Sequence, residues 1–296
     1  MAQQKFFEIW AEGAFDPSHI KTTIVPEGSS LKHTPESVQF LEQAWAAHVA
    51  KGNNPWPNDL KPTRYRTAGI SVENNVLHVT LDPCVRYCDA IGSRLPEFAV
   101  FGQDFLPRPT AVSAVIITND NKILYTVRKK ADYKKGGYHA SIGGFMEIKK
   151  ESSPTDAALR EVLEETGIAG SDIGSMLCLG YVYNPWTQHG DLVYVIYTTL
   201  SASQVLAKKH DDENEIRFIE ADDHGFEKLI LGFPHANVIV AMAGPLMLGT
   251  QMFGRKWRRQ MEAGLAEASA DYESEVVRDF LEGHDIAKFQ QFIQGQ

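Results

Sequence analysis

The sequence predicts an α/β fold in three parts, of which the central one, residues 108–232, holds most of the strands. Three observations support this prediction. Short segments rich in Val, Ile, Leu and Tyr recur in the central part, a helix with clear start and stop signals lies between them, and a helical pattern follows. A smaller α+β part, residues 1–105, is expected before the central part, and helices that pack on it are expected over residues 233–296.

The N-terminal part carries signals for one helix and one pair of strands. Thr34 is a suitable cap and Pro35 fits the first helical position, and an apolar stripe follows them. Apolar positions flank Asn74-Asn75 on both sides, which is typical of a tight turn between two strands. This part is therefore predicted to be a small α+β domain, and the stiff segment 105–109, Phe-Leu-Pro-Arg-Pro, joins it to the centre.

The central part contains segments with strand character on both sides of one helix. The segments are residues 111–117, 122–127, 176–183 and 192–200. The first two are separated by Asn119-Asp120-Asn121, which favours a turn, and the last two follow the helix. This order of strands and helix is the basis of the α/β prediction.

The helix between these strands is the best marked element of the chain. Ser153 is a suitable N-cap, Pro154 fits the first helical position, and Asp156 completes an arrangement like a capping box. Gly167 supplies the stop. An apolar stripe is expected to dock the helix, which leaves its charged residues together on or near the opposite edge.

Three carboxylates gather in one turn of this helix, directly after an arginine. Glu161 and Glu165 lie one turn apart, Glu164 lies beside them, and Arg160 is the local cation. Like charges at this spacing cost about 0.2–0.5 kcal/mol per pair, so we expect a bound cation to offset the repulsion. Oxygen ligands of this kind suit Mg²⁺ or Mn²⁺, which keep several waters and complete their shell with substrate phosphates.

The segment 143–168 resembles the box of the Nudix family, which has Gly, five residues, Glu, seven residues, then Arg-Glu-aliphatic-x-Glu-Glu-x-Gly-aliphatic. The second half matches without a gap at Arg160, Glu161, Val162, Glu164, Glu165, Gly167 and Ile168. The first half differs: counted from Gly144, Glu151 comes one residue late and Arg160 comes one residue later again, so the loop is two residues longer than the family pattern. The resemblance implies an α/β/α sandwich with a mixed sheet.

The resemblance also implies roles for individual residues. The metal site would consist of the backbone of Gly144 and the side chains of Glu161, Glu164 and Glu165, and these three glutamates would be catalytic. Arg160 would orient a carboxylate. Some family members take their general base from a glutamate in a later loop, and in this chain the acidic run 211–215 is the place to look, with Glu213 preferred over Glu215.

Substrate contacts are expected outside the box carboxylates. The candidates are Arg128, Tyr138, Glu147 and Trp186. Arg128 begins a basic stretch that either meets phosphates or is a solvated face, and Tyr138 closely precedes the glycine pair. Trp186 lies in a loop between two strands, where its ring either stacks on a base or fills the core.

The expected activity is Mg²⁺-dependent hydrolysis of a diphosphate bond in a nucleoside diphosphate linked to another group, with water attacking phosphorus. UDP-sugars or ADP-ribose-like compounds are preferred, since the long N-terminal extension resembles the Nudix branch that hydrolyses UDP-sugars. Two alternatives stay open: a nucleoside triphosphate pyrophosphohydrolase, and a non-catalytic Nudix-like protein that binds or senses a nucleotide. The extension argues against the first, and the lengthened loop favours the second.

The composition of the chain limits the classes of partner and the cellular compartment that we expect. The net charge of −9 argues against a nucleic-acid partner. The three cysteines contain no CxxC pair, and the N-terminus lacks the long apolar core of a signal peptide, so we expect a cytoplasmic protein. The uncharged segment 229–254 contains Gly and Pro, so we expect a buried helix, residues 236–243, followed by a break, and no membrane contact. The C-terminal helices are expected to pack back on the chain or to pair in a homodimer.

Overall fold

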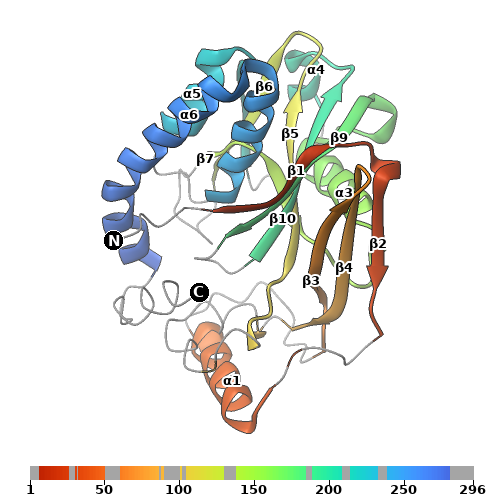
Figure 1. The fold of residues 1–296 in the computed structure, drawn as a ribbon, viewed down its shortest axis with the longest axis vertical. Helices are drawn as coiled ribbons and strands as arrows, with labels where there is room; N and C mark the ends of the chain where they lie inside the picture. The colour runs from red at the N-terminus through yellow and green to blue at the C-terminus, as the bar shows by residue number, and fades with distance from the viewer. Residues whose placement is uncertain are drawn as a thin grey trace.

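The structure is a computed structural model in which helices surround two β-sheets (Figure 1). The described residues are 7–26, 31, 33–50, 61–86, 88–89, 101, 105–129, 138–184, 189–208, 214–232 and 239–280. Within these ranges the strands form a larger and a smaller sheet.

The larger sheet has eight strands in the described part of the chain, in the order β1-β9-β10-β5-β6-β11, with β7 beside β6 and β8 beside β5. Its strands are β1 (Glu8–Phe15), β5 (Thr110–Ile117), β6 (Lys122–Arg128), β7 (Tyr138–His139), β8 (Ile142–Phe145), β9 (Ile173–Asn184), β10 (His189–Thr198) and β11 (Asn214–Glu220). β10 and β5 run parallel, whereas the neighbouring pairs β9–β10 and β6–β11 are antiparallel. The sheet is therefore mixed, as predicted.

The smaller sheet has the order β2-β4-β3 and comes entirely from the N-terminal part. Its strands are β2 (Ile20–Ile24), β3 (Arg64–Glu73) and β4 (Val76–Val85). Asn74 and Asn75 join β3 to β4 with φ angles of 50° and 60°, which is the left-handed conformation that a two-residue hairpin turn requires. Because β1 lies in the larger sheet, residues before position 105 contribute strands to both sheets.

Helices α1 and α3 begin at the positions that the sequence indicates, and α3 also ends where predicted. They are α1 (Pro35–Ala50), α3 (Pro154–Thr166), α4 (Ala202–Leu206), α5 (Asp223–Leu231) and α6 (Ile239–Phe280), with short 3₁₀ turns η1 (Pro17–His19) and η4 (Gly170–Asp172). The side chain of Ser153 accepts a hydrogen bond from the backbone of Asp156 at 3.2 Å and starts α3. Gly167 ends α3 with a φ of 71°, a conformation that glycine adopts without strain.

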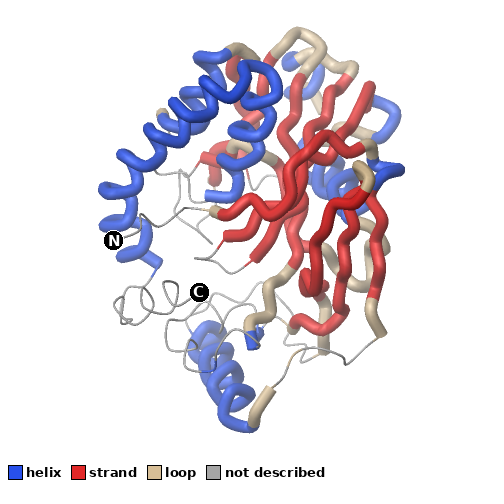
Figure 2. Tube along the Cα trace, viewed as in Figure 1, coloured by secondary structure: helices blue, strands red, loops and turns tan. Residues whose placement is uncertain are grey.

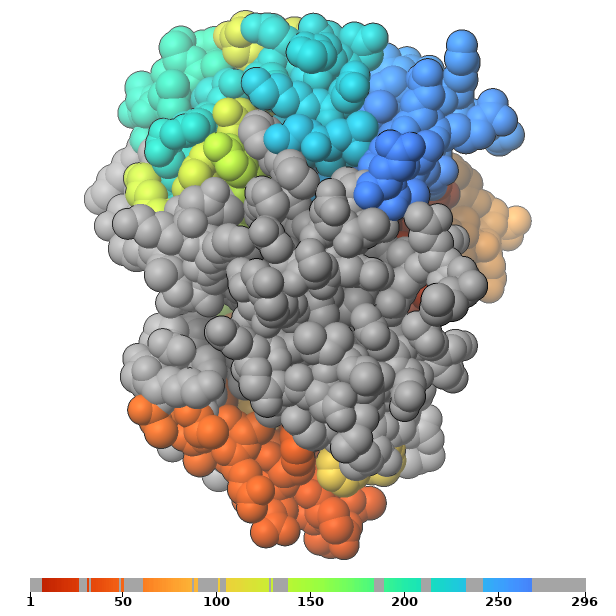
Figure 3. All heavy atoms as spheres, turned by 90° about the vertical axis from the view of Figure 1, so that its left-hand side faces the viewer, coloured from red at the N-terminus to blue at the C-terminus, as the bar shows by residue number. Residues whose placement is uncertain are grey.

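Helices cover both faces of the larger sheet (Figure 2). On one face, Val112 and Ile116 of β5 pack in one core with Val162 of α3, and the smaller sheet adds its own apolar residues to that core. On the other face, Val115 of β5 packs with residues of α5 and α6, including Phe226. The α/β/α sandwich is therefore confirmed. Helix α1 lies at the opposite end of the molecule from α5 and α6 (Figure 3).

Helix α6 differs from the predicted short helix and break. The helix continues through Pro245, and its change of direction comes at Gly254, whose φ of 85° is non-helical. Residues 242–249 are buried, and Gly244 lies so close to Val115 and Val193 that an added Cβ would crowd both side chains. The prediction of a break after residue 243 was wrong, because burial against the sheet outweighs the hydrogen bond that proline removes.

Segment 229–254, which prompted the question of membrane contact, contributes to α5 and α6, and these helices pack on the larger sheet. Among the described helices, none combines the length and the apolarity that crossing a bilayer needs.

Candidate active site

Helix α3 presents its charged edge to strand β8. Its buried residues include Ala157, Ala158 and Val162, which hold the helix on the sheet. The charged residues of the following turn are thereby left at the rim of this core, where the side chain of Glu161 is 13% exposed and that of Glu164 is 51% exposed. Helical spacing therefore brings together the box residues that the sequence singled out.

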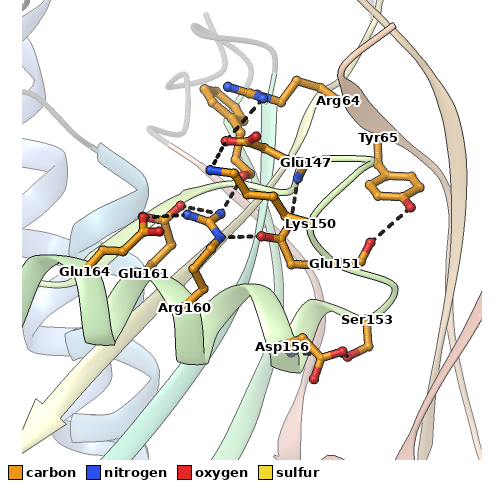
Figure 4. A network of polar contacts seen from close by, with 11 residues as sticks. Arg64, Tyr65, Glu147, Lys150, Glu151, Ser153, Asp156, Arg160, Glu161 and Glu164 are labelled. Atoms are coloured by element: carbon orange, nitrogen blue, oxygen red, sulfur yellow. Dashed lines mark hydrogen bonds and ion pairs between the residues drawn. The ribbon is translucent and has the colours of Figure 1, made fainter. Parts of the chain in front are cut away.

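Arg160 is the centre of a polar network around these carboxylates (Figure 4). Its Nε donates to Glu151, and its two terminal nitrogens lie 2.8 Å from Glu161 Oε1 and 2.9 Å from Glu164 Oε2. One terminal nitrogen also donates to the carbonyl of Phe145 at 3.3 Å. When ionised, three carboxylates thus surround one guanidinium, with a formal excess of two negative charges that a divalent cation would balance.

Glu151 pairs with Arg160 although the loop before it is longer than the family pattern. The Glu151 side chain is 2% exposed, and its Oε2 accepts a hydrogen bond from the backbone N–H of Glu147 at 2.7 Å. The backbone N–H groups of Lys150 and Glu151 both donate to the carbonyl of Glu147 at 3.1 Å. This tight turn brings the Glu151 carboxylate to the arginine.

Gly144 lies directly against Glu161. A Cβ added at Gly144 would overlap the Glu161 carboxylate, so a larger residue there would displace that carboxylate from the backbone of β8. Burial raises the pKa of Glu161, the Arg160 guanidinium lowers it, and Glu164 and Glu151 raise it further. A cation bound here would stabilise the ionised form of this glutamate.

Glu165 has a partner that sequence reasoning missed. Asn214, the buried first residue of β11, donates from Nδ2 to Glu165 Oε2 at 3.1 Å. The acidic run 211–215 therefore ends beside the box helix, although Glu213 itself lies outside the described residues. The sequence signal for Asn214 is only its place within that run.

Of the remaining candidates, Tyr138 and Glu147 are described with their side chains. The backbone of Arg128 pairs with Asn214, but its side chain is outside the described set, and so is the whole of Trp186. Tyr138 on β7 packs against Tyr125, with ring centroids 6.1 Å apart. Glu147 Oε1 lies 3.1 Å from Lys150 Nζ and 3.6 Å from Arg64 in the smaller sheet.

The carboxylate oxygens of the box glutamates suit a hard divalent cation, although those of Glu161 and Glu164 face Arg160 in this structure. Among the described residues, no three His, Cys, Asp or Glu side chains converge as a ready-made metal cluster. Mg²⁺ does not need such a cluster, since it is usually held by one or two carboxylates, several waters and substrate phosphates. Glu161, which lies against Gly144, and Glu164 can provide such ligands.

A second polar group lies on the opposite face of the sheet from α3. Asp191 of β10 is in register with Ala111, and Ala111 is in register with Phe145, the residue that follows Gly144. Asp191 Oδ1 lies 4.0 Å from His189 Nε2, and the His189 ring packs edge-on against Phe145 at 5.6 Å. Burial raises the pKa of Asp191 to about 7.

Replacing Asp191 by asparagine is expected to remove a pH dependence of stability. The folded protein keeps the Asp191 proton up to a pKa of about 7, whereas an unfolded chain releases it near its usual pKa of about 3.9. The stability linked to this proton is complete below about pH 4 and is lost as the pH rises through 7. The variant should therefore be more stable than the wild type at pH 8 by a few kcal/mol, on the order of 2–4. Urea unfolding at pH 5 and 8 tests this, and two curves that change in parallel with pH would contradict it.

A comparison with protein families agrees with the resemblance of the box. A family model for the NUDIX domain matches residues 107–241, and no curated protein matches the chain. Among solved structures, DR0079 from Deinococcus radiodurans is 13% identical, over 46% of this chain and 80% of its own, with a TM-score of 0.35. NrtR from Shewanella oneidensis is 21% identical, over 48% and 64%, at 0.33. A bifunctional NMN adenylyltransferase/ADP ribose pyrophosphatase from Francisella tularensis, complexed with AMP and a Mn ion, is 20% identical, over 45% and 40%, at 0.32.

Proposed function

We propose that the chain is a Mg²⁺- or Mn²⁺-dependent hydrolase of a diphosphate bond in a nucleoside diphosphate conjugate, because a family model for the NUDIX domain matches residues 107–241. The observation that carries the proposal is the position of Glu161 against the backbone of Gly144, within a cluster that has more carboxylates than cations. A scaffold without a ligand would gain nothing from this accumulation of negative charge.

The proposed chemistry assigns separate tasks to the box residues. A bound divalent cation would screen the phosphate charges, polarise a P–O bond and lower the pKa of water. Glu161, Glu164 and Glu165 would supply its ligands with the backbone of Gly144. Arg160, held by Glu151, would keep two of these carboxylates in one place.

The general base is proposed to lie in the acidic run 211–215, with Glu213 as the first residue to replace. The support is indirect: Asn214 bonds to Glu165, so this part of the chain reaches the box helix. Arg128, Tyr138 and Trp186 stay proposals for substrate contacts, and so does Glu147, whose carboxylate is already paired with Lys150.

The proposed substrate class is a UDP-sugar or an ADP-ribose-like compound, ahead of nucleoside triphosphates. Its support is that the N-terminal part packs directly on the loop of residues 147–151 that precedes α3, which we call the box loop. The N-terminal part is therefore in contact with the region of the candidate site. We further propose a cytoplasmic protein whose partner is this small molecule and not a nucleic acid, and whose C-terminal helices either pack only within the chain or also form a homodimer.

Phosphate release in a phosphatase-coupled assay tests the proposed function. The full chain is incubated with Mg²⁺ and UDP-glucose, ADP-ribose, NADH, diadenosine polyphosphates or dNTPs, with and without EDTA, beside Glu164→Gln and Glu165→Gln. EDTA-sensitive release from one diphosphate conjugate, greatly reduced in both variants, would support the proposal. Release from dNTPs alone would favour the triphosphate hydrolase, and binding without release would favour a sensor.

Replacing Gly144 by alanine is expected to lower this hydrolysis about 100-fold, because a displacement of a catalytic group by about 1 Å has effects of that size. The added methyl group would displace the Glu161 carboxylate from β8. Gly170→Ala is the matched control, since a Cβ at Gly170 meets nothing within 4 Å. Initial rates at saturating Mg²⁺ are the measurement, and equal rates for the two alanine variants would argue against a role for the Gly144 contact.

A further inference from the structure

Strand β3 of the smaller sheet contacts the box loop, although the two segments are far apart in the sequence. Arg64 and Glu147 form an antiparallel bridge, and the carbonyl of Thr63 accepts a hydrogen bond from the backbone of Ile148 at 3.1 Å. The same strand is also tied to the start of β5, where Thr67 Oγ1 lies 2.7 Å from Thr110 Oγ1. β3 therefore contacts the NUDIX domain at two places, and one of them is the loop that leads to Glu151.

The side chain of Tyr65 reaches the end of this loop. Tyr65 is 4% exposed, and its hydroxyl donates to the carbonyl of Glu151 at 3.1 Å. Burial raises the pKa of Tyr65, and the Glu151 carboxylate raises it further, so the hydroxyl keeps its proton and stays a donor at neutral pH. This hydrogen bond fixes the backbone of the residue whose side chain holds Arg160.

Arg64 acts on the other end of the same loop. Its guanidinium is largely buried and lies 3.6 Å from Glu147 Oε1, while Lys150 approaches the same carboxylate at 3.1 Å. The backbone N–H of Glu147 donates to Glu151 Oε2. Arg64 and Tyr65 thus hold both ends of the segment 147–151, and that segment aims the Glu151 carboxylate at Arg160 (Figure 4).

We propose that β3 is a positioning element for the metal ligands: Arg64 and Tyr65 hold the lengthened box loop so that Glu151 keeps Arg160 oriented toward Glu161 and Glu164. A longer loop has more conformations to lose when it is ordered, and contacts from a neighbouring strand offset that loss. The N-terminal sheet would thus support the cation site without supplying a metal ligand. The inference rests on the proposed function only in taking these glutamates as metal ligands, and it concerns cation affinity directly.

Direct binding of Mn²⁺, followed by electron paramagnetic resonance, tests the inference without any assay of hydrolysis. Full-length Tyr65→Phe loses one hydroxyl and is expected to bind Mn²⁺ about 10-fold more weakly, as is usual when a group supporting a metal ligand is removed. Thr67→Val is the matched control, because it removes a buried hydrogen bond of the same strand that does not touch the box loop. It should lower the melting temperature to a similar degree while leaving Mn²⁺ affinity within about twofold of the wild type.

Arg64 gives a second and independent pair of variants. Arg64→Met is expected to weaken Mn²⁺ binding, and Arg64→Lys should restore part of it because a cation again faces Glu147. Weaker Mn²⁺ binding in both Tyr65→Phe and Arg64→Met, but not in Thr67→Val, would support the inference. Unchanged Mn²⁺ affinity in folded Tyr65→Phe, or equal weakening in Thr67→Val, would overturn it.

The inference and the proposed hydrolysis can fail separately. If Mn²⁺ binds as expected but no compound of the substrate panel is hydrolysed, the positioning role stands and the hydrolase proposal is wrong. If the wild-type protein binds no Mn²⁺, the positioning role and the metal-dependent hydrolysis are both wrong.

Discussion

Glu161→Gln is expected to reduce metal-dependent hydrolysis about 100-fold or more while the protein stays folded. Glutamine keeps the size of the side chain and one oxygen for Arg160, but it lacks the charge that attracts a cation. Burial raises the pKa of Glu161 despite the adjacent guanidinium, so an ionised Glu161 destabilises the metal-free protein at neutral pH. The variant should therefore melt at the same temperature as the metal-free wild type or above it.

The rate and the Mg²⁺ concentration for half-maximal activity should be measured together with the melting temperature. Glu220→Gln provides the control, since Glu220 is 60% exposed and pairs with Lys122 on the surface. Its rate should equal that of the wild type. A Glu161→Gln protein that melts normally and hydrolyses at the wild-type rate would exclude Glu161 as a ligand.

Arg160→Met is expected to destabilise the protein by about 3–5 kcal/mol, which is the usual consequence of removing one partner from a buried ion pair. Methionine has a similar length but offers no donor to Glu151, Glu161 or Glu164. Glu151 is affected most, because its carboxylate is 2% exposed and would be left buried beside the other two. Urea unfolding at pH 7 measures the loss directly.

The double variant Arg160→Met/Glu151→Gln shows whether this loss comes from the uncompensated carboxylate. Glutamine at position 151 can still accept from the backbone of Glu147 but carries no charge. We therefore expect the double variant to be more stable than Arg160→Met alone, because coupled neighbours are not additive. Losses that simply add would show that the network contributes little to stability.

Local rules were enough to predict the elements that surround the site. The cap at Ser153, the stop at Gly167 and the turn at Asn74-Asn75 each depend on a few adjacent residues, and each lies where the sequence places it. Helical spacing alone also predicts that Glu161 and Glu164 share one edge of α3.

Contacts between distant segments could not be predicted in this way. In the sequence, Glu151 comes one residue later than the family pattern requires, and only the fold shows that its carboxylate meets Arg160. The bond from Asn214 to Glu165 and the bond from Tyr65 to the carbonyl of Glu151 join residues 49 and 86 positions apart. The length of α6 was missed for the same reason, since its packing on the sheet decides whether the helix passes Pro245.

The contact between β1 and α6 has a consequence for the order of folding. Arg258 of α6 lies 2.6 Å and 2.7 Å from the carboxylate oxygens of Glu12 in β1, and Gln251 donates to the carbonyl of Gly13 at 2.8 Å. Arg258 and Glu12 are 246 positions apart, so a ribosome must release most of the chain before they can meet. The face of the larger sheet on which α6 packs is therefore not covered by this helix until α6 itself has been synthesised.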